Sequence, residues 1–268
     1  MDDKHCKERK IDLVRHLLCY CGNIDNCVGM TEVWSKIRFR EEGDFQAGAV
    51  IVIDKPLRWT SFDVVNKVRI CLKRKFGKIK VGHAGTLDPL ASGVVIVCVG
   101  KETKEIERYM GEEKEYVAEI TFGHTTPSYD LETSFNGTFT YEHVNRMLME
   151  EVITRFVGEI EQYPPIFSAV RVDGVRAYEK ARKGDEVEMK SRRVTIREIE
   201  IVKMELPVVE LRIVCSKGTY IRSLAHDLGQ ACGSGSYLSA LRRSRVGGFK
   251  VEDACKMNEV VETLQEML

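Results

Sequence analysis

The segment VGHAGTLDPLASGVVIVCVG, residues 81–100, places one carboxylate between a glycine-rich turn and an apolar run. Gly82 and Gly85 permit backbone conformations that other residues resist, and Pro89 restricts the chain directly after Asp88. The run VVIVCV that follows has the length and β-branched composition of a buried strand. An acid on a restricted loop before a core strand can be aimed at a target. Asp-Pro also starts ordinary turns, so a purely structural role stays open.

The composition is typical of a globular protein, and its net charge gives no general affinity for polyanions. The 268 residues are 43% hydrophobic and 31% charged, and 41 basic residues balance 41 acidic ones. This length allows one or two domains with a substantial core. We expect no membrane association, because no apolar run reaches the length of about 18 residues that a membrane span requires. Nine scattered cysteines and a charged N-terminus without signal-peptide character indicate a cytoplasmic protein with reduced thiols.

Basic residues gather in separate segments although the net charge is zero. NKVRICLKRKFGKIK (66–80) holds seven basic residues and no acid, and LRRSRVGGFK (241–250) holds four and no acid. Residues 171–197 carry nine basic residues against five acidic ones. A neutral protein with segregated basic surfaces can bind nucleic acid on one face. Solvated helix faces explain any single run equally well.

The order of apolar patterns predicts an α+β fold with a central mixed, largely antiparallel sheet flanked by helices. Helices and strands are mixed without a regular βαβ rhythm. Thr60 or Ser61 is expected to cap the first helix, with Phe62, Val65, Val68 and Leu72 on its apolar face and Gly77 at its end. Thr219 or Ser216 is expected to cap the helix that contains SLAHDLG. The expected strands are 48–56, 94–100, 114–123, 192–205 and 207–218, and the expected helices are 61–76, 141–158, 219–233 and 257–267.

No metal site or nucleotide cofactor is predicted. GKETK and GHAG lack the spacing of phosphate-binding loops. His83 and Asp88 have no third ligand nearby, and the four cysteines before residue 28 lack paired CxxC spacing.

Tyr220 and Arg222, in CSKGTYIRSLAHDLG, stand at a strand-to-helix junction. An arginine there suits a carboxylate partner and could hold Asp88 ionised and oriented. Taken alone, Tyr116 and Leu241 are ordinary core residues, and Asp130 in HTTPSYD is an ordinary loop acid.

Six segments together resemble the tRNA pseudouridine synthase B (TruB) family. They occur in the family's order and cover about residues 48–250, and the block around Asp88 is the most diagnostic. The segments are IVIDKPLRWTSFDVVNKV, GHAGTLDPLASGVVIVCVGKETK, KEYVAEITFG, QYPPIFSAVRVDGVRAYEKARKG, CSKGTYIRSLAHDLG and YLSALRRSRVGGF.

The resemblance implies a fold, a reaction and a substrate. The fold is that of the pseudouridine synthases, with an active-site cleft in a catalytic domain at residues 48–268. The reaction flips uridine 55 out of the TΨC loop of tRNA, breaks its C–N glycosidic bond and forms a C–C bond. It needs no cofactor.

The resemblance also assigns residues. Asp88 falls on the catalytic aspartate, Arg222 on its arginine partner, and Tyr116 on the tyrosine that packs against the base and helps to remove the C5 proton. The implied substrate-binding residues are Lys55, His83, Asp130, Tyr220 and Leu241.

Several features depart from the family pattern. GHAG replaces GHTG, Arg58 replaces the glycine of KPxGxTS, and the loop that ends in Asp130 keeps only its final acid. Residues 1–47 have no identified counterpart and are expected to be an extension of unknown role. No room is expected for the C-terminal PUA domain of many relatives. We therefore expect the runs 66–80 and 171–197 to hold the TΨC stem-loop of tRNA, with the protein acting as a monomer without an obligatory protein partner.

Two other functions stay open. A guide-RNA-dependent synthase would share the fold, although that type depends on a PUA domain. A tRNA-folding factor would bind the tRNA elbow without required catalysis, although the intact set of Asp88, Tyr116 and Arg222 argues against that role.

Overall fold

The computed structural model of the chain describes residues 36–39, 43–172 and 174–266. They form two compact units that are each assembled from separate parts of the chain. The first unit contains residues up to 87, 94–107 and 251 onward, and the second contains 88–93 and 108–250. The predicted extension at 1–47, with its early cysteines, lies outside the described residues apart from 36–39 and 43–47. None of the helices described is long and apolar enough to cross a membrane.

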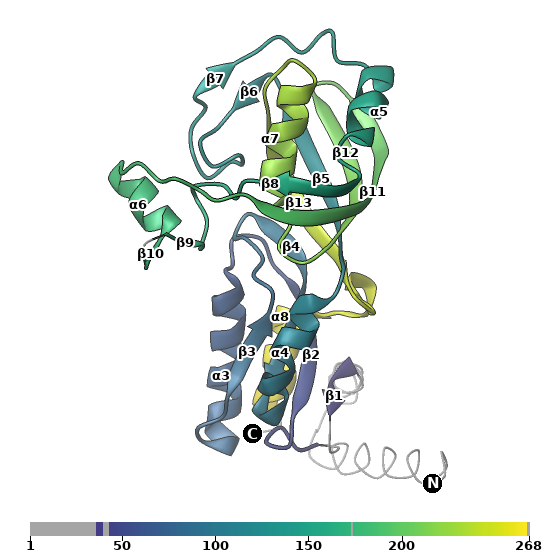
Figure 1. Ribbon diagram of the computed structural model, residues 1–268. Coiled ribbons are helices and arrows are strands. Elements are labelled where there is room, and N and C mark those ends of the chain that lie inside the picture. The colour runs from purple at the N-terminus through teal and green to yellow at the C-terminus, as the bar shows by residue number, and fades with distance from the viewer. Residues whose placement is uncertain (1–35, 40–42, 173, 267–268) are drawn as a thin grey trace. The chain divides into compact units, whose positions relative to one another are not determined.

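The first unit is built from a buried strand and an amphipathic helix. Strand β2 lies between β1 and β4, β3 pairs with β4 in antiparallel fashion, and β15 pairs with β2 in parallel. Helix α3 packs against α8 and β3 (Figure 1). The elements are β1 (Arg38–Phe39), β2 (Ala49–Lys55), α3 (Ser61–Phe76), β3 (Val81–Ala84), β4 (Ala91–Val99), η1 (Gly100–Glu105), η2 (Val251–Asp253), β15 (Cys255–Lys256) and α8 (Met257–Glu266).

Helix α3 begins and ends where the sequence predicts. The Thr60 hydroxyl accepts a hydrogen bond from the Asp63 amide, and the Asp63 carboxylate accepts one from the Thr60 amide, which forms a capping box. Gly77 ends the helix with a φ of 63°. The expectation for Phe62 is wrong, since it is 61% exposed while Val64 is fully buried. The buried face of the helix includes Ser61, Val64 and Cys71 beside the predicted Val65, Val68 and Leu72.

The second unit contains a mixed, largely antiparallel sheet, which confirms the predicted fold class. The strand order is β4, β13, β5, β12, β11, β8, where β4 contributes its first residues. Only the pairing of β13 with β4 is parallel. The elements are α4 (Ile106–Gly111, shared with the first unit), β5 (Lys114–Phe122), β6 (His124–Thr125), β7 (Gly137–Thr138), α5 (Arg146–Thr154), β8 (Gly158–Gln162), β9 (Arg171–Val172), β10 (Val175–Arg176), α6 (Ala177–Lys183), β11 (Arg192–Glu205), β12 (Val208–Cys215), α7 (Ile221–Ala231), β13 (Ser236–Val246) and β14 (Phe249–Lys250).

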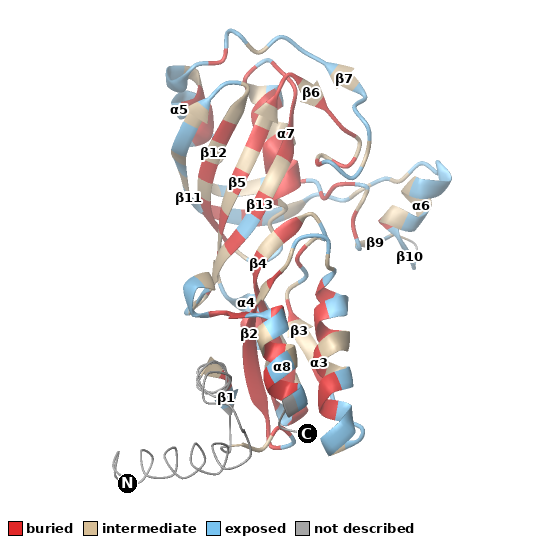
Figure 2. Cartoon of the chain, turned by 180° about the vertical axis from the view of Figure 1, so that it is seen from behind, coloured by how far each residue is buried: buried red, intermediate tan, exposed pale blue. Residues whose placement is uncertain are grey.

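Helix α7 covers one face of this sheet, over β13 and β5 (Figures 1 and 2). Strand β5 alternates between buried and half-buried residues along its whole length, as its sequence predicts. The expected caps of α7 are wrong, because Tyr220 is the N-cap and no side chain caps it. The Thr219 hydroxyl donates instead to the Ser216 carbonyl at 3.0 Å. Helix α5 also starts later than predicted, where Asn145 accepts a hydrogen bond from the Leu148 amide.

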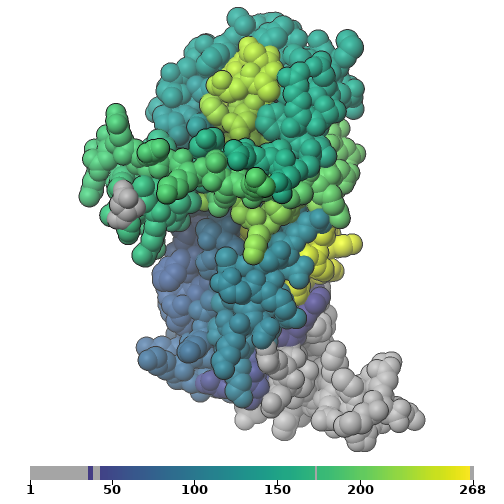
Figure 3. Space-filling view, in the orientation of Figure 1, coloured from purple at the N-terminus to yellow at the C-terminus, as the bar shows by residue number. Residues whose placement is uncertain are grey.

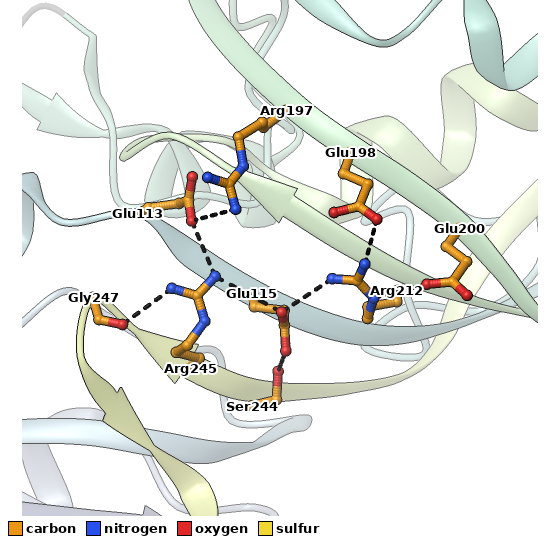
Figure 4. Close-up of polar contacts among 9 residues, drawn as sticks. All are labelled: Glu113, Glu115, Arg197, Glu198, Glu200, Arg212, Ser244, Arg245 and Gly247. Atoms are coloured by element: carbon orange, nitrogen blue, oxygen red, sulfur yellow. Dashed lines mark hydrogen bonds and ion pairs between the residues drawn. The ribbon is translucent and has the colours of Figure 1, made fainter.

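An ion-pair network joins four strands on the half-buried face of this sheet (Figure 4). Arg212 on β12 lies 3.1 Å from Glu115 on β5 and 2.9 Å from Glu200 on β11, and it also contacts Glu198. Arg245 on β13 lies 3.7 Å from Glu115. Single surface pairs contribute little, but a shared network restrains several strands at once. Because side chains alternate along a strand, fixing Glu115 on this face directs Tyr116 to the other.

Gly93 marks the closest approach of β4 to β13. It has a φ of 107°, and a Cβ atom there would lie 2.2 Å from the Arg243 carbonyl oxygen. The parallel pair of these two strands, with Gly93 opposite Arg243, therefore requires glycine.

We predict that Gly93→Ala lowers the free energy of unfolding by roughly 3 kcal/mol or more, because strain and a backbone clash add. Urea unfolding followed by circular dichroism measures the change. Gly111→Ala is the control, since a Cβ at Gly111 meets nothing within 4 Å. Equal urea midpoints for Gly93→Ala and Gly111→Ala would contradict this prediction, because they would show that β4 can move away from β13 without loss of stability.

Candidate active site

Asp88 sits on the turn that leads into β4, as its sequence context predicts. Its carbonyl accepts a hydrogen bond from the Ala91 amide at 3.1 Å, which closes the turn. The preceding Leu87 is held from both sides by the buried Ser61 hydroxyl, which accepts from its amide and donates to its carbonyl. The Asp88 side chain is 36% exposed. A carboxylate on so constrained a backbone presents its oxygens in a defined direction.

Arg222 is the buried cation that Asp88 faces. Its side chain is only 5% exposed, and its Nε lies 3.0 Å from Oδ2 of Asp88 in an ion pair without the alignment of a hydrogen bond. Its Nη1 donates to the carbonyls of Phe167 at 3.0 Å and Ser128 at 3.3 Å. The same nitrogen lies 3.6 Å from Oδ2 of Asp130. One guanidinium therefore joins three segments of the second unit around Asp88.

Asp130 is the second carboxylate on this guanidinium, and it is buried. Burial raises the pKa of Asp130, while a hydrogen bond from Ser128 and the charge of Arg222 lower it. Its Oδ1 accepts from the Glu132 amide at 2.9 Å. With Asp130 enclosed, Asp88 is the more accessible acid of the pair.

Tyr116 and Leu241 lie on neighbouring strands of the sheet, both nearly buried. Arg243 is opposite Tyr116 in the β5–β13 register, is 1% exposed and bonds to the phenol. Burial raises the pKa of the Tyr116 phenol, the Arg243 charge opposes the rise, and the Asp88 carboxylate adds to it. The phenol is therefore neutral near pH 7 and lies within the electrostatic reach of Asp88.

Tyr220 is held on both sides of its backbone. The Gln162 amide group accepts from the Tyr220 amide at 2.7 Å and donates to its carbonyl at 3.0 Å. The Arg192 guanidinium covers its ring, with Cζ 4.2 Å from the ring centroid. This anchored aromatic ring stands two residues before Arg222. The structure thus brings Asp88, Arg222, Asp130, Tyr116, Tyr220 and Leu241 into one unit.

Two family models together match most of the described chain. One, for the N-terminal domain of TruB family pseudouridylate synthases, matches residues 73–221. The other, for the C-terminal domain of tRNA pseudouridylate synthase B, matches residues 222–267. The chain belongs to the TruB family of pseudouridylate synthases. It is therefore an isomerase.

Relatives and solved structures agree with this family. The tRNA pseudouridine synthase B of Phocaeicola vulgatus is 53% identical over 225 residues, 83% of this chain and 96% of that protein. The one from Flavobacterium johnsoniae is 51% identical over 83% of this chain and 98% of its own length. A chain in the crystal structure of a Cbf5-Nop10-Gar1 complex is 33% identical with a TM-score of 0.62. That match covers 81% of this chain, which spans about half the length of the other.

One departure from the TruB pattern lies in the first unit. Arg58 stands where the family motif has glycine, and its φ of 67° lies in the left-handed region that glycine favours. The fully buried Lys55 ammonium donates to the carbonyls of Pro56 at 3.0 Å and Trp59 at 2.6 Å, which closes this turn. Through these contacts Lys55 stabilises the turn. His83 lies on β3 and is paired with Val97 on β4. Substrate binding by Lys55 and His83 stays a prediction.

Sequence reasoning missed two groups beside the site: the buried Arg243 behind Tyr116, and an aromatic stack. Tyr129 has a φ of 63°, and its ring stacks on His226 with centroids 4.1 Å apart. Tyr129 lies between Ser128 and Asp130, the two residues of its loop that hold Arg222. His226 follows Arg222 by four residues, so the two share a face of α7, and that spacing was the available signal.

Helix α7 reaches the surface on its far side, as the yellow-green patch between teal segments in Figure 3 shows. Asp227 lies on this half-buried part of the helix. Burial raises its pKa from 3.8 to about 6. The described residues place no group of three or more His, Cys, Asp or Glu side chains so that they could hold a metal ion.

We predict that Asp227→Asn stabilises the protein more at pH 8 than at pH 4. The folded state holds the Asp227 proton more tightly than the unfolded state, so wild-type stability falls as pH rises from about 4 through about 6. Asp227→Asn carries no carboxyl that must lose a proton, so its stability relative to wild type rises by up to about 3 kcal/mol over this pH range. Urea unfolding at a series of pH values measures it. The exposed Asp185→Asn is the control, and an equal pH profile for wild type and Asp227→Asn would contradict the burial argument.

Proposed function

We propose that this isomerase converts uridine 55 in the TΨC loop of tRNA to pseudouridine. The observation that carries the proposal is the 3.0 Å ion pair between the partly exposed Asp88 and the buried Arg222, with Tyr116 beside it. The high identity to proteins named tRNA pseudouridine synthase B supports tRNA as the substrate.

The proposed reaction starts when the target uridine leaves its stack, at a cost of a few kcal/mol. The flipped base then lies against Tyr116, Tyr220 and Leu241, which supply aromatic and apolar surface. Asp130, which lies on the same guanidinium as Asp88, is proposed to contact the uracil. An enclosed site of this kind excludes water and strengthens the electrostatic contacts made within it.

Asp88 is proposed to act as the nucleophile or base that Arg222 orients through their ion pair. It attacks C1′ of the ribose or C6 of the uracil, or removes a proton from the sugar; all three routes need an aimed carboxylate. The N1–C1′ bond breaks, the uracil rotates and C5 bonds to C1′, and in the two routes of attack the bond to Asp88 then breaks and returns its electron pair to the carboxylate. The C5 proton leaves with the help of Tyr116, and N1 gains a proton, so no electrons are gained or lost overall.

We further propose that the enzyme acts in the cytoplasm as a monomer, without an obligatory protein partner. Its two basic runs, 66–80 and 171–197, would hold the tRNA. Lys73, Arg74 and Lys75 are exposed at the last turn of α3 and form a basic surface that a phosphate backbone would attract.

A guide-RNA-dependent activity is the second candidate, and a structural likeness favours it. The similar chains include one in an H/ACA RNP bound to a substrate RNA, with 30% identity and a TM-score of 0.59. The identity to the tRNA enzymes is higher and extends over almost their full length. We therefore favour action on free tRNA.

A tritium-release assay tests the proposed function. The substrates are an unmodified tRNA transcript with C5-labelled uridine and the same transcript with cytidine at position 55. We expect release from the first only. Release that requires an added guide RNA would favour the second candidate, and no release from either would contradict both.

Removing the carboxylate should abolish the reaction but not binding. We predict that Asp88→Ala lowers tritium release by about a thousandfold or more, the scale of losing an essential nucleophile, while tRNA affinity by filter binding stays within a few-fold. Asp253→Ala is the control at an exposed acid outside both basic runs. Lost binding would mean that Asp88 is structural, and full function of Asp88→Asn in vivo would favour a tRNA-folding role.

Reversing the charge of Lys73, Arg74 and Lys75 to Glu should weaken tRNA binding and make it less dependent on salt. Each lost phosphate contact lowers the slope of log affinity against log salt by about 0.7 to 0.9. Fluorescence anisotropy over a salt series measures the slope. The control is the double variant Arg146→Glu, Arg155→Glu on α5, where both side chains are exposed. An unchanged slope would remove the run from the RNA-binding surface.

A further inference from the structure

Arg192, at the start of β11, carries a guanidinium that is shielded from water but not paired. Its Nε and Nη2 have essentially no solvent contact and no hydrogen-bond partner among the described residues. Within the same part of the chain, no acidic side chain forms an ion pair with it. Its neighbour Arg193, by contrast, is exposed and lies 3.3 Å from Glu159.

The guanidinium is held in place at the edge of the candidate site. Its Cζ lies 4.2 Å above the Tyr220 ring, and its Nη1 borders Gly218, where a Cβ would lie 3.6 Å away. Arg192 pairs with Gln162 across the β11–β8 ladder, and the Gln162 side chain holds both backbone groups of Tyr220. Strand, ring and helix start therefore form one frame around this cation, and the ring belongs to Tyr220, two residues before Arg222.

A shielded, unpaired guanidinium is costly and needs an explanation. Burial lowers the pKa of Arg192, which reports the same penalty. The contact with Tyr220 occupies one flat face of the group but leaves the N–H donors on its edge unsatisfied. Those in-plane donors match the oxygens of a phosphate, to which arginine binds with two parallel hydrogen bonds.

We propose that Arg192 binds a phosphodiester group of the RNA substrate close to the target nucleotide. The Tyr220 ring sets the plane of the guanidinium, so one aromatic residue both lines the base pocket and aims the phosphate contact. This inference rests on the proposed function, since it assigns the ligand as RNA. Binding of the phosphate compensates the charge that the protein leaves unpaired.

The test is a salt series of RNA binding, read by fluorescence anisotropy with the TΨC stem-loop. The full chain carries Asp88→Asn, so that no turnover accompanies binding. Arg192→Gln is expected to lower affinity by roughly tenfold or more and to flatten the salt slope by about 0.7 to 0.9, the value for one phosphate. Arg146→Gln on α5, an exposed arginine outside both basic runs, is the control and is expected to change neither. Arg192→Lys keeps the charge and is expected to keep the slope, with weaker binding because the fork is lost.

A methylphosphonate scan then identifies the phosphate. Each phosphate of the stem-loop is replaced in turn by its neutral analogue. With Arg192 present, one position near the target uridine should lose about as much affinity as Arg192→Gln does. In the Arg192→Gln protein the same replacement should cause almost no further loss, because the partner is already gone.

Three outcomes would overturn the assignment. The first is a salt slope of Arg192→Gln equal to that of Arg146→Gln, with unfolding midpoints equal to wild type. The second is full additivity at every phosphate in the scan. The third is a slower reaction with unchanged slope, which would mean that Arg192 only orients Tyr220. Tritium release by wild type, measured separately, keeps these failures distinct from failure of the proposed function.

Discussion

The charge of Arg222 is the constraint on which the second unit depends. A guanidinium that is 5% exposed destabilises the fold unless its charge and its donors are satisfied. Two carboxylates and two backbone carbonyls do this, and they come from the Asp88 turn, the 128–130 loop and Phe167. Folding of these segments onto one cation is therefore the same event that orients Asp88. The exposed oxygen of Asp88 is what remains available for chemistry.

The sheet of the second unit positions Tyr116 through contacts that do not involve Arg222. On its buried face, Arg243 bonds to the Tyr116 phenol from the neighbouring strand. On its other face, Arg212 and Arg245 share Glu115, one residue before Tyr116. Gly93 lets β4 approach β13 closely enough for the two strands to pair. The two faces thus differ in role, since one carries Tyr116, which is proposed to take part in the reaction, and the other restrains the strands that present it.

Several unfavourable features lie in the second unit, which carries the site, and the left-handed Arg58 lies in the first. Tyr129 has left-handed backbone geometry, Arg192 lacks a partner, and Asp227 has a raised pKa. Such features persist where surrounding structure enforces them, and they are frequent at functional sites. Helix α3 of the first unit shows the opposite character, with a complete capping box and a glycine stop. Local rules predict that helix almost to the residue, and they fail most often near Arg222.

The sequence by itself determined the local elements: the limits of α3 at Thr60 and Gly77, the alternation of β5, and the restrained turn that carries Asp88. Family resemblance also singled out Asp88, Arg222, Asp130, Tyr116, Tyr220 and Leu241, which the structure brings into one unit. Only the tertiary structure decided which of them share a guanidinium and that Phe62 faces solvent. It also decided three side-chain contacts: Tyr129 with His226, Tyr116 with Arg243, and Tyr220 with Arg192. Caps and strand periods depend on neighbours a few residues away, whereas these pairs join residues 28 to 127 positions apart, and their contact depends on strand register and helix packing that no local pattern encodes.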